Sequence, residues 1–361
     1  MLLPNVPPIT LKLHLPPVSL PTQTATVLAE NLTDWRIAGL PANVPPQGHL
    51  WQIAAVCEAA QPVDWRTNIE GAIASPDNGL RMSAMGQATN RPYTWPDAPT
   101  ILALVPHWRC EPWLPGALAS LSRQTHPPTQ IVVIDDASPQ PPLAIAQNFP
   151  NVTLLQAPER VGPYGLIQSV IDHTDYDAYL FQDADDWSSG DRLATLLQTA
   201  RHHGAELVGS QEIRVLENPA QFQAVGYPLD VNQALRPAPG HPLLHPTSLV
   251  TRSLVQRLGG FATGLRFGGD TEFLLRAHWQ ARIVNSPRFC YFRRKRPQSL
   301  TTDLATGLDS PARQALTQQM KQRAIANAQA FAQGQPLDLR PMYTASAIAL
   351  KHCCGPPLRW R

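Results

Sequence analysis

Three carboxylates follow an apolar run near the middle of the chain. Residues 178–182 read as a buried strand, and Asp183, Asp185 and Asp186 come directly after it. Because side chains alternate along an extended strand, Asp183 and Asp185 should point to the same side. Two carboxylates on one side, with a third beside them, form a hard-oxygen site for Mg²⁺ or Mn²⁺. The pattern indicates a divalent-metal site; a polar turn that caps the next helix is the alternative interpretation.

Two further acidic pairs occur at places where ligands are often bound. Asp135 and Asp136 end the β-branched run 131–134, where a carboxylate can accept a hydrogen bond from a base or a ribose hydroxyl. Asp270 and Glu272 follow glycines at a probable helix start, and glycine permits close approach of a ligand. Turn formation at the first pair, and helix capping at the second, are the alternatives.

The elements that would position these residues begin near residue 100. Short apolar runs alternate there with segments of helical periodicity, which predicts a mostly parallel, doubly wound α/β sheet flanked by helices. Ser189 is expected to cap the third helix, and 215–245 are expected to form an irregular loop. The expected strands are 101–105, 131–134, 152–155, 178–182, 206–208 and 289–292. The expected helices are 114–121, 165–171, 193–200, 251–258, 270–277 and one that starts at Pro311.

Composition bounds the class of protein. The chain has 361 residues, 43% of them hydrophobic, which fits a globular protein. Its net charge of +2 is too small for the strongly positive surface typical of nucleic-acid-binding proteins. Its five cysteines include no CxxC pair, so neither a disulfide framework nor a zinc site is expected. No basic, apolar leader and no long apolar run are present, which predicts a cytoplasmic protein without a transmembrane segment. Any association of this protein with a membrane would have to be peripheral.

The chain divides into three regions by composition. Residues 1–97 are rich in proline and contain short strand-like pieces, so they form either a small β-rich domain or a loosely ordered arm of unknown role. Residues 98–305 carry the α/β pattern and all three acidic clusters. Residues 306–361 are expected to form a C-terminal helix, with Ser310 at its N-cap, and a tail.

Four motifs in fixed order resemble the family 2 glycosyltransferases, which have the GT-A fold. They are Ser-Leu-x-x-Gln-Thr at 120–125, Asp-Asp-x-Ser at 135–138, the aspartates of 183–186, and Gly-Gly-Phe at 259–261 followed by 269–273. The resemblance covers about residues 100–302. It implies an inverting enzyme, of the hexosyltransferase class, that uses a divalent metal. The enzyme would move a sugar from a nucleotide-sugar, most simply a UDP-sugar, to a hydroxyl of a glycan or glycan precursor.

The resemblance also implies a role for each matching residue. The residues it assigns to the nucleotide are Asp135, Asp136, Arg160, Gly162 and Asp183. Those it assigns to the metal are Asp185 and Asp186, with Asp270 as the general base and Glu272 as a supporting acid. Those it places in a segment that closes over the diphosphate are Arg294, Arg296 and Ser299.

Some positions depart from the family pattern and keep other functions open. His107, Trp108 and Arg109 stand where the family commonly has x-Tyr-Asn, and Arg296 replaces a frequent histidine. A degenerate domain that binds a nucleotide or sugar without transfer is one alternative. A phosphohydrolase of the DxDx(T/V) type is another, although Trp187 follows the aspartates where that motif places threonine or valine.

Overall fold

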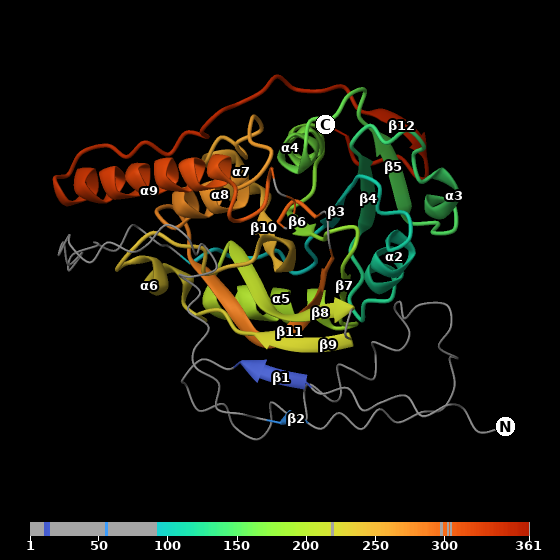
Figure 1. The fold of residues 1–361 in the computed structure, drawn as a ribbon, viewed down its shortest axis with the longest axis horizontal. Helices are drawn as coiled ribbons and strands as arrows, with labels where there is room; N and C mark the ends of the chain where they lie inside the picture. The colour runs from blue at the N-terminus through green and yellow to red at the C-terminus, as the bar shows by residue number, and fades with distance from the viewer. Residues whose placement is uncertain are drawn as a thin grey trace.

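The structure is a computed structural model that describes residues 92–217, 220–296, 299–301, 303 and 305–360. Of the chain before residue 92 it describes only β1 (Leu11–His14) and β2 (Ala55–Val56). The remaining predictions for the proline-rich region therefore lie outside the described residues. β1 pairs in parallel with both β2 and β9 (Ala220–Val225), so it extends one edge of the main sheet (Figure 1).

A single large sheet organises the molecule, with strand order β12-β5-β4-β3-β6-β10-β8-β9-β1-β2. Its central strands β3 (Ile101–His107), β4 (Gln130–Asp135), β5 (Val152–Gln156) and β6 (Ala178–Phe181) run parallel. This confirms the predicted mostly parallel, GT-A type α/β fold. The other strands are β7 (Trp187–Ser188), β8 (Leu207–Glu217), β10 (Leu249–Thr251), β11 (Ile283–Lys295) and β12 (Lys351–Cys354).

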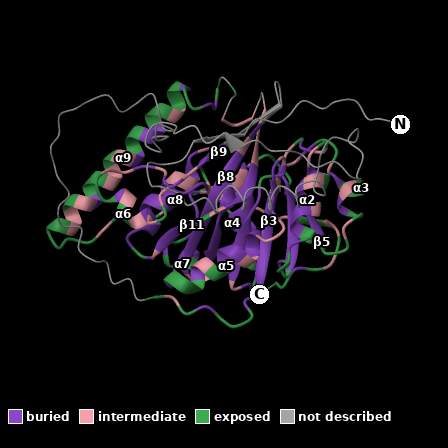
Figure 2. Ribbon diagram, turned by 90° about the horizontal axis from the view of Figure 1, so that it is seen from below, coloured by how far each residue is buried: buried purple, intermediate pink, exposed green. Residues whose placement is uncertain are grey.

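Helices cover both faces of the sheet, as the doubly wound pattern requires. One face packs on α2 (Leu114–Ser122), α3 (Leu143–Ala146) and α5 (Arg192–His203). The other packs on α4 (Pro163–His173), α7 (Arg252–Arg257), α8 (Gly269–Ala277) and the start of α9 (Pro311–Ala332). Side chains of β3 point alternately to the two faces of the sheet, so Ala103 packs in the core on the first face and Leu104 in the core on the second. Figure 2 shows this buried sheet, and α9 with a largely exposed surface beside it.

The segment predicted as a loop at 215–245 is more regular than expected. β8 runs on to Glu217, β9 follows it, and a short helix α6 (Val231–Leu235) and a 3₁₀ turn η2 (His245–Thr247) come later. The polar residues of β8 concealed the strand: Glu212 is buried, but Arg214 pairs with it at 2.7 Å. β11, which pairs with β8 along most of its length, likewise begins at Ile283 rather than at 289.

The start of the third helix was also predicted wrongly. α5 begins at Arg192 with Asp191 at its N-cap position, so Ser189 lies before the helix. The Ser189 hydroxyl instead donates to Asp191 Oδ1 at 2.7 Å. The predicted N-cap of α9 is confirmed, because the Ser310 side chain accepts from the main-chain N–H of Arg313.

Contacts cross both predicted domain boundaries. Trp95 is buried, and its indole Nε1 donates to the carbonyl of Ala205 at 2.9 Å, which ties the chain before residue 98 to the α/β domain. At the other end, the C-terminal segment passes from α9 over the top of the molecule in Figure 1, and β12 pairs antiparallel with β5. Among the described residues no helix combines the length and apolarity needed to cross a membrane.

Candidate active site

The site lies where the central parallel strands end. β4 ends at Asp135, β6 ends two residues before Asp183, and β3 ends at His107, which is in register with Asp135. The carboxyl ends of parallel strands share one edge of a sheet, and ligands bind there in open α/β folds. The fold therefore brings the first two acidic clusters to the same edge.

Asp135 is fully buried and hydrogen-bonded within the protein. Its Oδ1 lies 2.8 Å from His107 Nδ1, and its Oδ2 accepts from the Ser138 main-chain N–H at 2.9 Å. Burial by itself raises the pKa of the carboxyl, but the hydrogen bonds from His107 and Ser138 outweigh burial and lower it. Asp135 is thus an ionised anchor for the turn that carries Asp136.

Asp136 holds the loop before α4. Its Oδ1 accepts from the Val161 main-chain N–H at 2.7 Å, and its Oδ2 accepts from that of Gly162 at 3.0 Å. Gly162 has a φ of 85°, a conformation that other residues adopt only with strain. The guanidinium of Arg160 lies 3.4 Å from the ring centroid of Trp108. The structure therefore brings together three residues predicted to bind the nucleotide, with Trp108 beside them.

The predicted metal site has suitable geometry. Asp183, Asp185 and Asp186 offer carboxylate oxygens that all lie within 4.8 Å of one another. The surrounding protein and the charge of Asp185 raise the pKa of both Asp183 and Asp186. Crowded carboxylates of this kind repel one another, and a divalent cation relieves the repulsion. Three hard-oxygen donors fit Mg²⁺ or Mn²⁺.

A buried arginine and a buried tyrosine support this aspartate loop. Arg192 donates to the carbonyls of Phe181 at 2.7 Å and Pro246 at 2.6 Å, and also to the side chain of Gln182 at 2.9 Å. The Tyr291 hydroxyl accepts from the Asp183 main-chain N–H at 3.1 Å. The loop is therefore held by a side chain of α5 on one side and by one of β11 on the other.

The basic segment after β11 contacts the same carboxylates. The Arg294 main-chain N–H donates to Asp186 Oδ1 at 2.7 Å, and Arg296 Nε donates to Asp185 Oδ2 at 2.6 Å. The Ser299 hydroxyl lies 3.1 Å from that of Thr301. Arg294 and Arg296, expected to close over a diphosphate, thus contact the clustered aspartates, whereas the Ser299 hydroxyl lies beside that of Thr301 in its own segment.

Asp270 lies at the start of α8 with two oriented neighbours. The Tyr164 hydroxyl donates to its Oδ1 at 3.0 Å, and His241 Nε2 lies 3.7 Å from its Oδ2. Burial would raise the pKa of Asp270, but His241, His245 and the Tyr164 hydrogen bond outweigh burial and lower it. The carboxylate is therefore ionised at neutral pH, the state required of a proton acceptor.

The glycine before Asp270 makes this geometry sterically feasible. A Cβ on Gly269 would lie 2.8 Å from Cδ2 of the Tyr164 ring, closer than real contacts allow. Tyr164 can therefore reach Asp270 only because residue 269 has no side chain. Asp270 also lines a cavity of about 130 Å³, which its α8 neighbour Glu272 does not line.

Glu272, predicted to be a supporting acid, forms ion pairs with two arginines. It is buried, its Oε2 accepts from Arg276 Nη2 at 2.7 Å, and its Oε1 accepts from Arg323 at 3.1 Å. Arg276 in turn donates to the carbonyls of Leu258 and Gly260, which explains why a Gly-Gly-Phe turn accompanies this helix. The role of a supporting acid stays a prediction; these bonds occupy the carboxylate on another side of α8 from Asp270.

Sequence reasoning did not find the two residues that orient Asp270. Tyr164 is 106 positions from Asp270 in the chain, and His241 lies in a proline-rich stretch without periodicity. Neither belongs to a motif that marks a site on its own. The available signal was the glycine pair at 268–269. It indicated that some group packs closely against the backbone there, but it did not identify that group as the Tyr164 ring.

Comparison with known proteins identifies the class. The sequence model of the family described as Glycosyl transferase family 2 matches residues 103–248, which contain the first two acidic clusters. This match, with the GT-A arrangement of the sheet, defines the α/β domain as that of a glycosyltransferase. The resemblance expected from the motifs is therefore confirmed for residues 103–248.

Similar solved structures include S. aureus TarS (residues 1–349). Its complex with UDP-GlcNAc is 20% identical, with a TM-score of 0.48, over 64% of this chain and 73% of that chain. Its complex with UDP is 21% identical, with a TM-score of 0.47, over 64% of this chain and 72% of that chain. No curated protein sequence matches this chain.

Proposed function

We propose that the protein is a metal-dependent, inverting glycosyltransferase that moves a sugar from a UDP-sugar to a hydroxyl acceptor, a glycan or glycan precursor. One observation carries the proposal: the three-carboxylate cluster lies close enough to the oriented, ionised Asp270 for their charges to interact. The charge of Asp270 contributes to the raised pKa of Asp183, so the two groups interact across the site. A metal-binding set beside a proton acceptor suits displacement at an anomeric carbon.

The donor's nucleotide would bind at the ends of β3 and β4. Asp136 and the adjoining turn at Asp135 offer carboxylates, and Arg160 with Gly162 forms the facing loop. Asp183, the most exposed of the three clustered aspartates, would meet the ribose. The Trp108 ring and the Arg160 guanidinium stacked on it add a flat cationic surface next to these residues. Trp108 stands where the family commonly has a tyrosine.

Asp185 and Asp186 would hold the metal ion, with Arg294 and Arg296 beside them. A bound Mg²⁺ or Mn²⁺ would supply positive charge to the oxygens of the departing diphosphate. The guanidinium groups of the two arginines can stabilise the same charge as it develops. Their position at Asp185 and Asp186 supports the expected role of this segment.

Asp270 would take the proton of the acceptor hydroxyl. The hydroxyl oxygen forms a bond to the anomeric carbon as the bond from that carbon to the diphosphate oxygen breaks. The electron pair of the broken bond leaves with the nucleoside diphosphate, and the proton remains on Asp270. Attack opposite the leaving group inverts the anomeric configuration.

The test combines nucleotide binding with turnover. UDP with Mg²⁺ or Mn²⁺ should raise the melting temperature of the protein, and UDP-sugar should be hydrolysed slowly or transferred. Asp185→Asn should remove the metal dependence of both, whereas Asp270→Asn should keep UDP binding and lose turnover. Asp97→Asn, at an exposed carboxylate, is the matched control. Equal turnover by wild type and Asp185→Asn would refute the proposal.

The other interpretations give different results in the same assays. A degenerate domain would bind UDP with metal but turn over no UDP-sugar. A phosphohydrolase would release phosphate from a simple phosphate ester and leave a UDP-sugar intact.

A further inference from the structure

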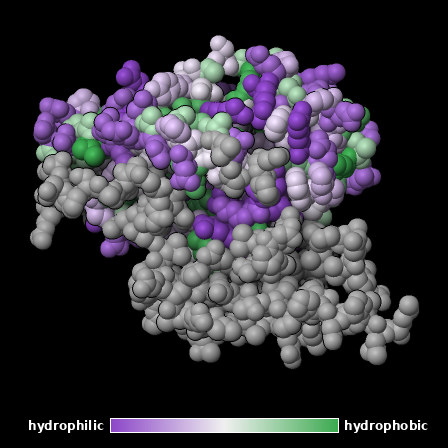
Figure 3. Space-filling view, viewed as in Figure 1, coloured by the Kyte–Doolittle hydropathy of each residue, from purple (hydrophilic) through white to green (hydrophobic). Residues whose placement is uncertain are grey.

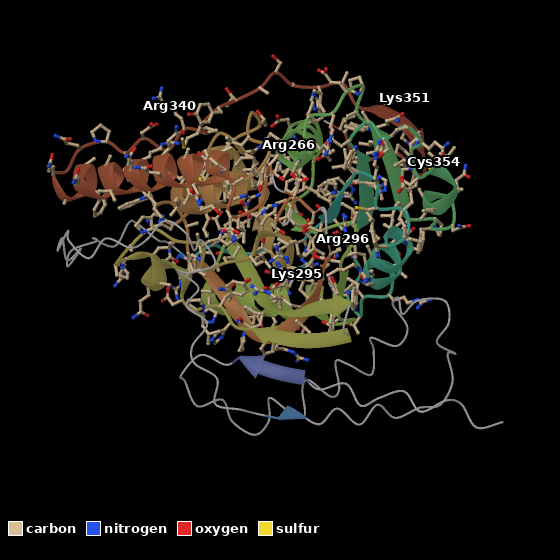
Figure 4. The ribbon with its side chains drawn as sticks, in the orientation of Figure 1. Arg266, Lys295, Arg296, Arg340, Lys351 and Cys354 are labelled. Atoms are coloured by element: carbon tan, nitrogen blue, oxygen red, sulfur yellow. The ribbon has the colours of Figure 1, made fainter. Side chains whose placement is uncertain are left out.

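The cavity beside Asp270 has a strongly basic wall. Its volume is about 130 Å³, and its lining includes Arg214 from β8, Arg293 and Lys295 from β11, and Arg313 from α9. Figure 4 labels Lys295 at the centre of the molecule, where Figure 3 shows hydrophilic side chains gathered on the same face. Three separate elements thus direct cations toward one small volume.

The carboxylates near this cavity do not balance its cations. Among the described residues that line it, Asp270 is the single acid against four basic side chains. Glu212 lies behind the wall; its Oε1 is 2.7 Å from Arg214 Nε, and its Oε2 is 3.7 Å from Arg293 Nη1. Even with Glu212 included, the cations outnumber the carboxylates.

Two of these cations have no acidic partner among the described residues. Arg313 donates to the carbonyl oxygens of Thr306 at 2.8 Å and Leu300 at 3.0 Å, which carry only partial charge. No described carboxylate forms an ion pair with Lys295. Burial, together with the charges of Arg293 and Arg214, lowers the pKa of the Lys295 ammonium to about 8. An excess of poorly neutralised charge in a small cavity favours an anion from outside the protein.

The donor's diphosphate is not the best candidate for that anion. The expected metal ligands Asp183, Asp185 and Asp186 do not line the cavity, whereas Asp270 and its neighbour Thr271 do. The cations therefore share the cavity with the expected proton acceptor, while Arg293 also interacts with Asp183 and Asp186 from outside it.

Building on the function proposed above, we propose that this cavity is the acceptor subsite and selects an anionic acceptor. The acceptor carries a phosphate or carboxylate close to the hydroxyl that is glycosylated. Lys295 and Arg313 bind the anionic group and so bring the hydroxyl to Asp270. Arg214 and Arg293 add the field that attracts the acceptor into the cavity.

The test measures anion binding with the donor site filled. The protein saturated with UDP and Mg²⁺ is titrated at pH 7 in a calorimeter with inorganic phosphate, with glucuronate and with glucose. Phosphate, glucuronate or both should bind, and their relative affinity distinguishes a phosphate-bearing from a carboxylate-bearing acceptor. Glucose, which carries no charge, should bind at least about tenfold more weakly than the preferred anion.

Variants connect the binding to the cavity. Lys295→Gln should weaken the preferred anion about tenfold, and Lys295→Arg should restore most of the affinity. Lys351→Gln, on the exposed edge strand, is the control, and thermal unfolding checks that each variant folds. Failure of both anions to bind, or an unchanged dissociation constant in Lys295→Gln, would overturn the proposal. So would a Lys295→Gln variant that loses UDP affinity instead, because the cation would then serve the donor.

The same proteins distinguish failure of the proposed enzymatic function from failure of the proposed acceptor subsite. UDP binding and UDP-sugar hydrolysis depend on Asp185 and report on the proposed enzyme. If UDP does not bind, that function fails, and titration of phosphate into the protein without nucleotide still decides whether the cavity binds anions.

Discussion

The Nε of Arg296 lies 2.6 Å from Oδ2 of Asp185, so a cation of the protein itself already neutralises one of the expected metal ligands. The Arg296 guanidinium also lies 4.6 Å from the ring centroid of Trp113, which helps to hold it there. A metal ion must compete with this ion pair for the same carboxylate oxygen. A metal ion bound by Asp185 would therefore have to displace the Arg296 guanidinium from this oxygen.

Replacing Arg296 should therefore separate metal affinity from turnover. Arg296→Gln removes the competing charge, so the dissociation constant for Mn²⁺ without nucleotide should fall about threefold or more. Transfer should fall about tenfold because a cation near the diphosphate is lost. Calorimetry and a UDP-release assay measure the two effects, with exposed Arg340→Gln as the control. Weaker Mn²⁺ binding in Arg296→Gln would contradict the competition.

Tyr164→Phe should weaken catalysis without affecting the donor. The ring and its packing on Phe261 remain, but the hydrogen bond to Asp270 Oδ1 is lost. The turnover number should fall about threefold to tenfold, with the KM for the donor unchanged. Because that hydrogen bond stabilises the carboxylate, its loss raises the pKa of Asp270, and the acid limb of the pH–rate profile should move to higher pH. Tyr343→Phe, at an exposed tyrosine, should change neither quantity.

Gly269→Ala should disturb both stability and transfer. The new Cβ would lie 2.8 Å from the Tyr164 ring, and the resulting shift should cost about 1–3 kcal/mol of unfolding free energy. Transfer should fall as well, since Tyr164 would move away from Asp270. Gly334→Ala has open space but a φ of 67°, and should cost only about 1 kcal/mol with full activity. Urea unfolding and a transfer assay compare the two; equal activity would argue against the role of Tyr164.

Anion binding in the basic cavity should depend on pH through Lys295. The ammonium has a pKa of about 8 rather than its usual 10.5, so it loses its charge as pH rises through that value. Groups facing it include Arg293, Arg214, Glu212 and Asp186, and all four remain in Lys295→Gln, so that variant isolates the contribution of Lys295. Affinity for glucuronate, whose carboxylate keeps its charge throughout this range, should fall from pH 7 to 9 in wild type. In Lys295→Gln it should stay nearly flat, and parallel curves for the two proteins would assign the titration to another group.

Local sequence patterns predicted the parts of the site that are contiguous in the chain. The apolar run before Asp183 and the β-branched run before Asp135 each define a buried strand and the polar turn that follows it. Strands of this type are buried on both faces, so their composition is distinctive and their ends are well marked. The clustering of Asp183, Asp185 and Asp186 and the position of Asp270 at a helix start followed directly.

Local sequence patterns could not predict contacts between residues that are far apart in the chain. β8 and β11 carry polar residues that become buried only because Glu212 pairs with Arg214 and lies near Arg293, so their sequence resembles loop. The family resemblance implied that Glu272 is a supporting acid, and an α-helix turns the side chains of Asp270 and Glu272 about 200° apart. Periodicity could show this difference of face, but not that Arg276 and Arg323 occupy the other side.

The Glu272 network makes the position of α8 depend on distant parts of the chain. One carboxylate accepts from Arg323 on α9 and from the main-chain N–H of Met342 in the C-terminal segment, at 3.1 Å and 2.9 Å. Sequence changes in either segment can therefore shift Asp270 slightly without altering any residue that touches a substrate. Acceptor preference can evolve from the periphery of such an enzyme while the residues that perform the chemistry stay constant.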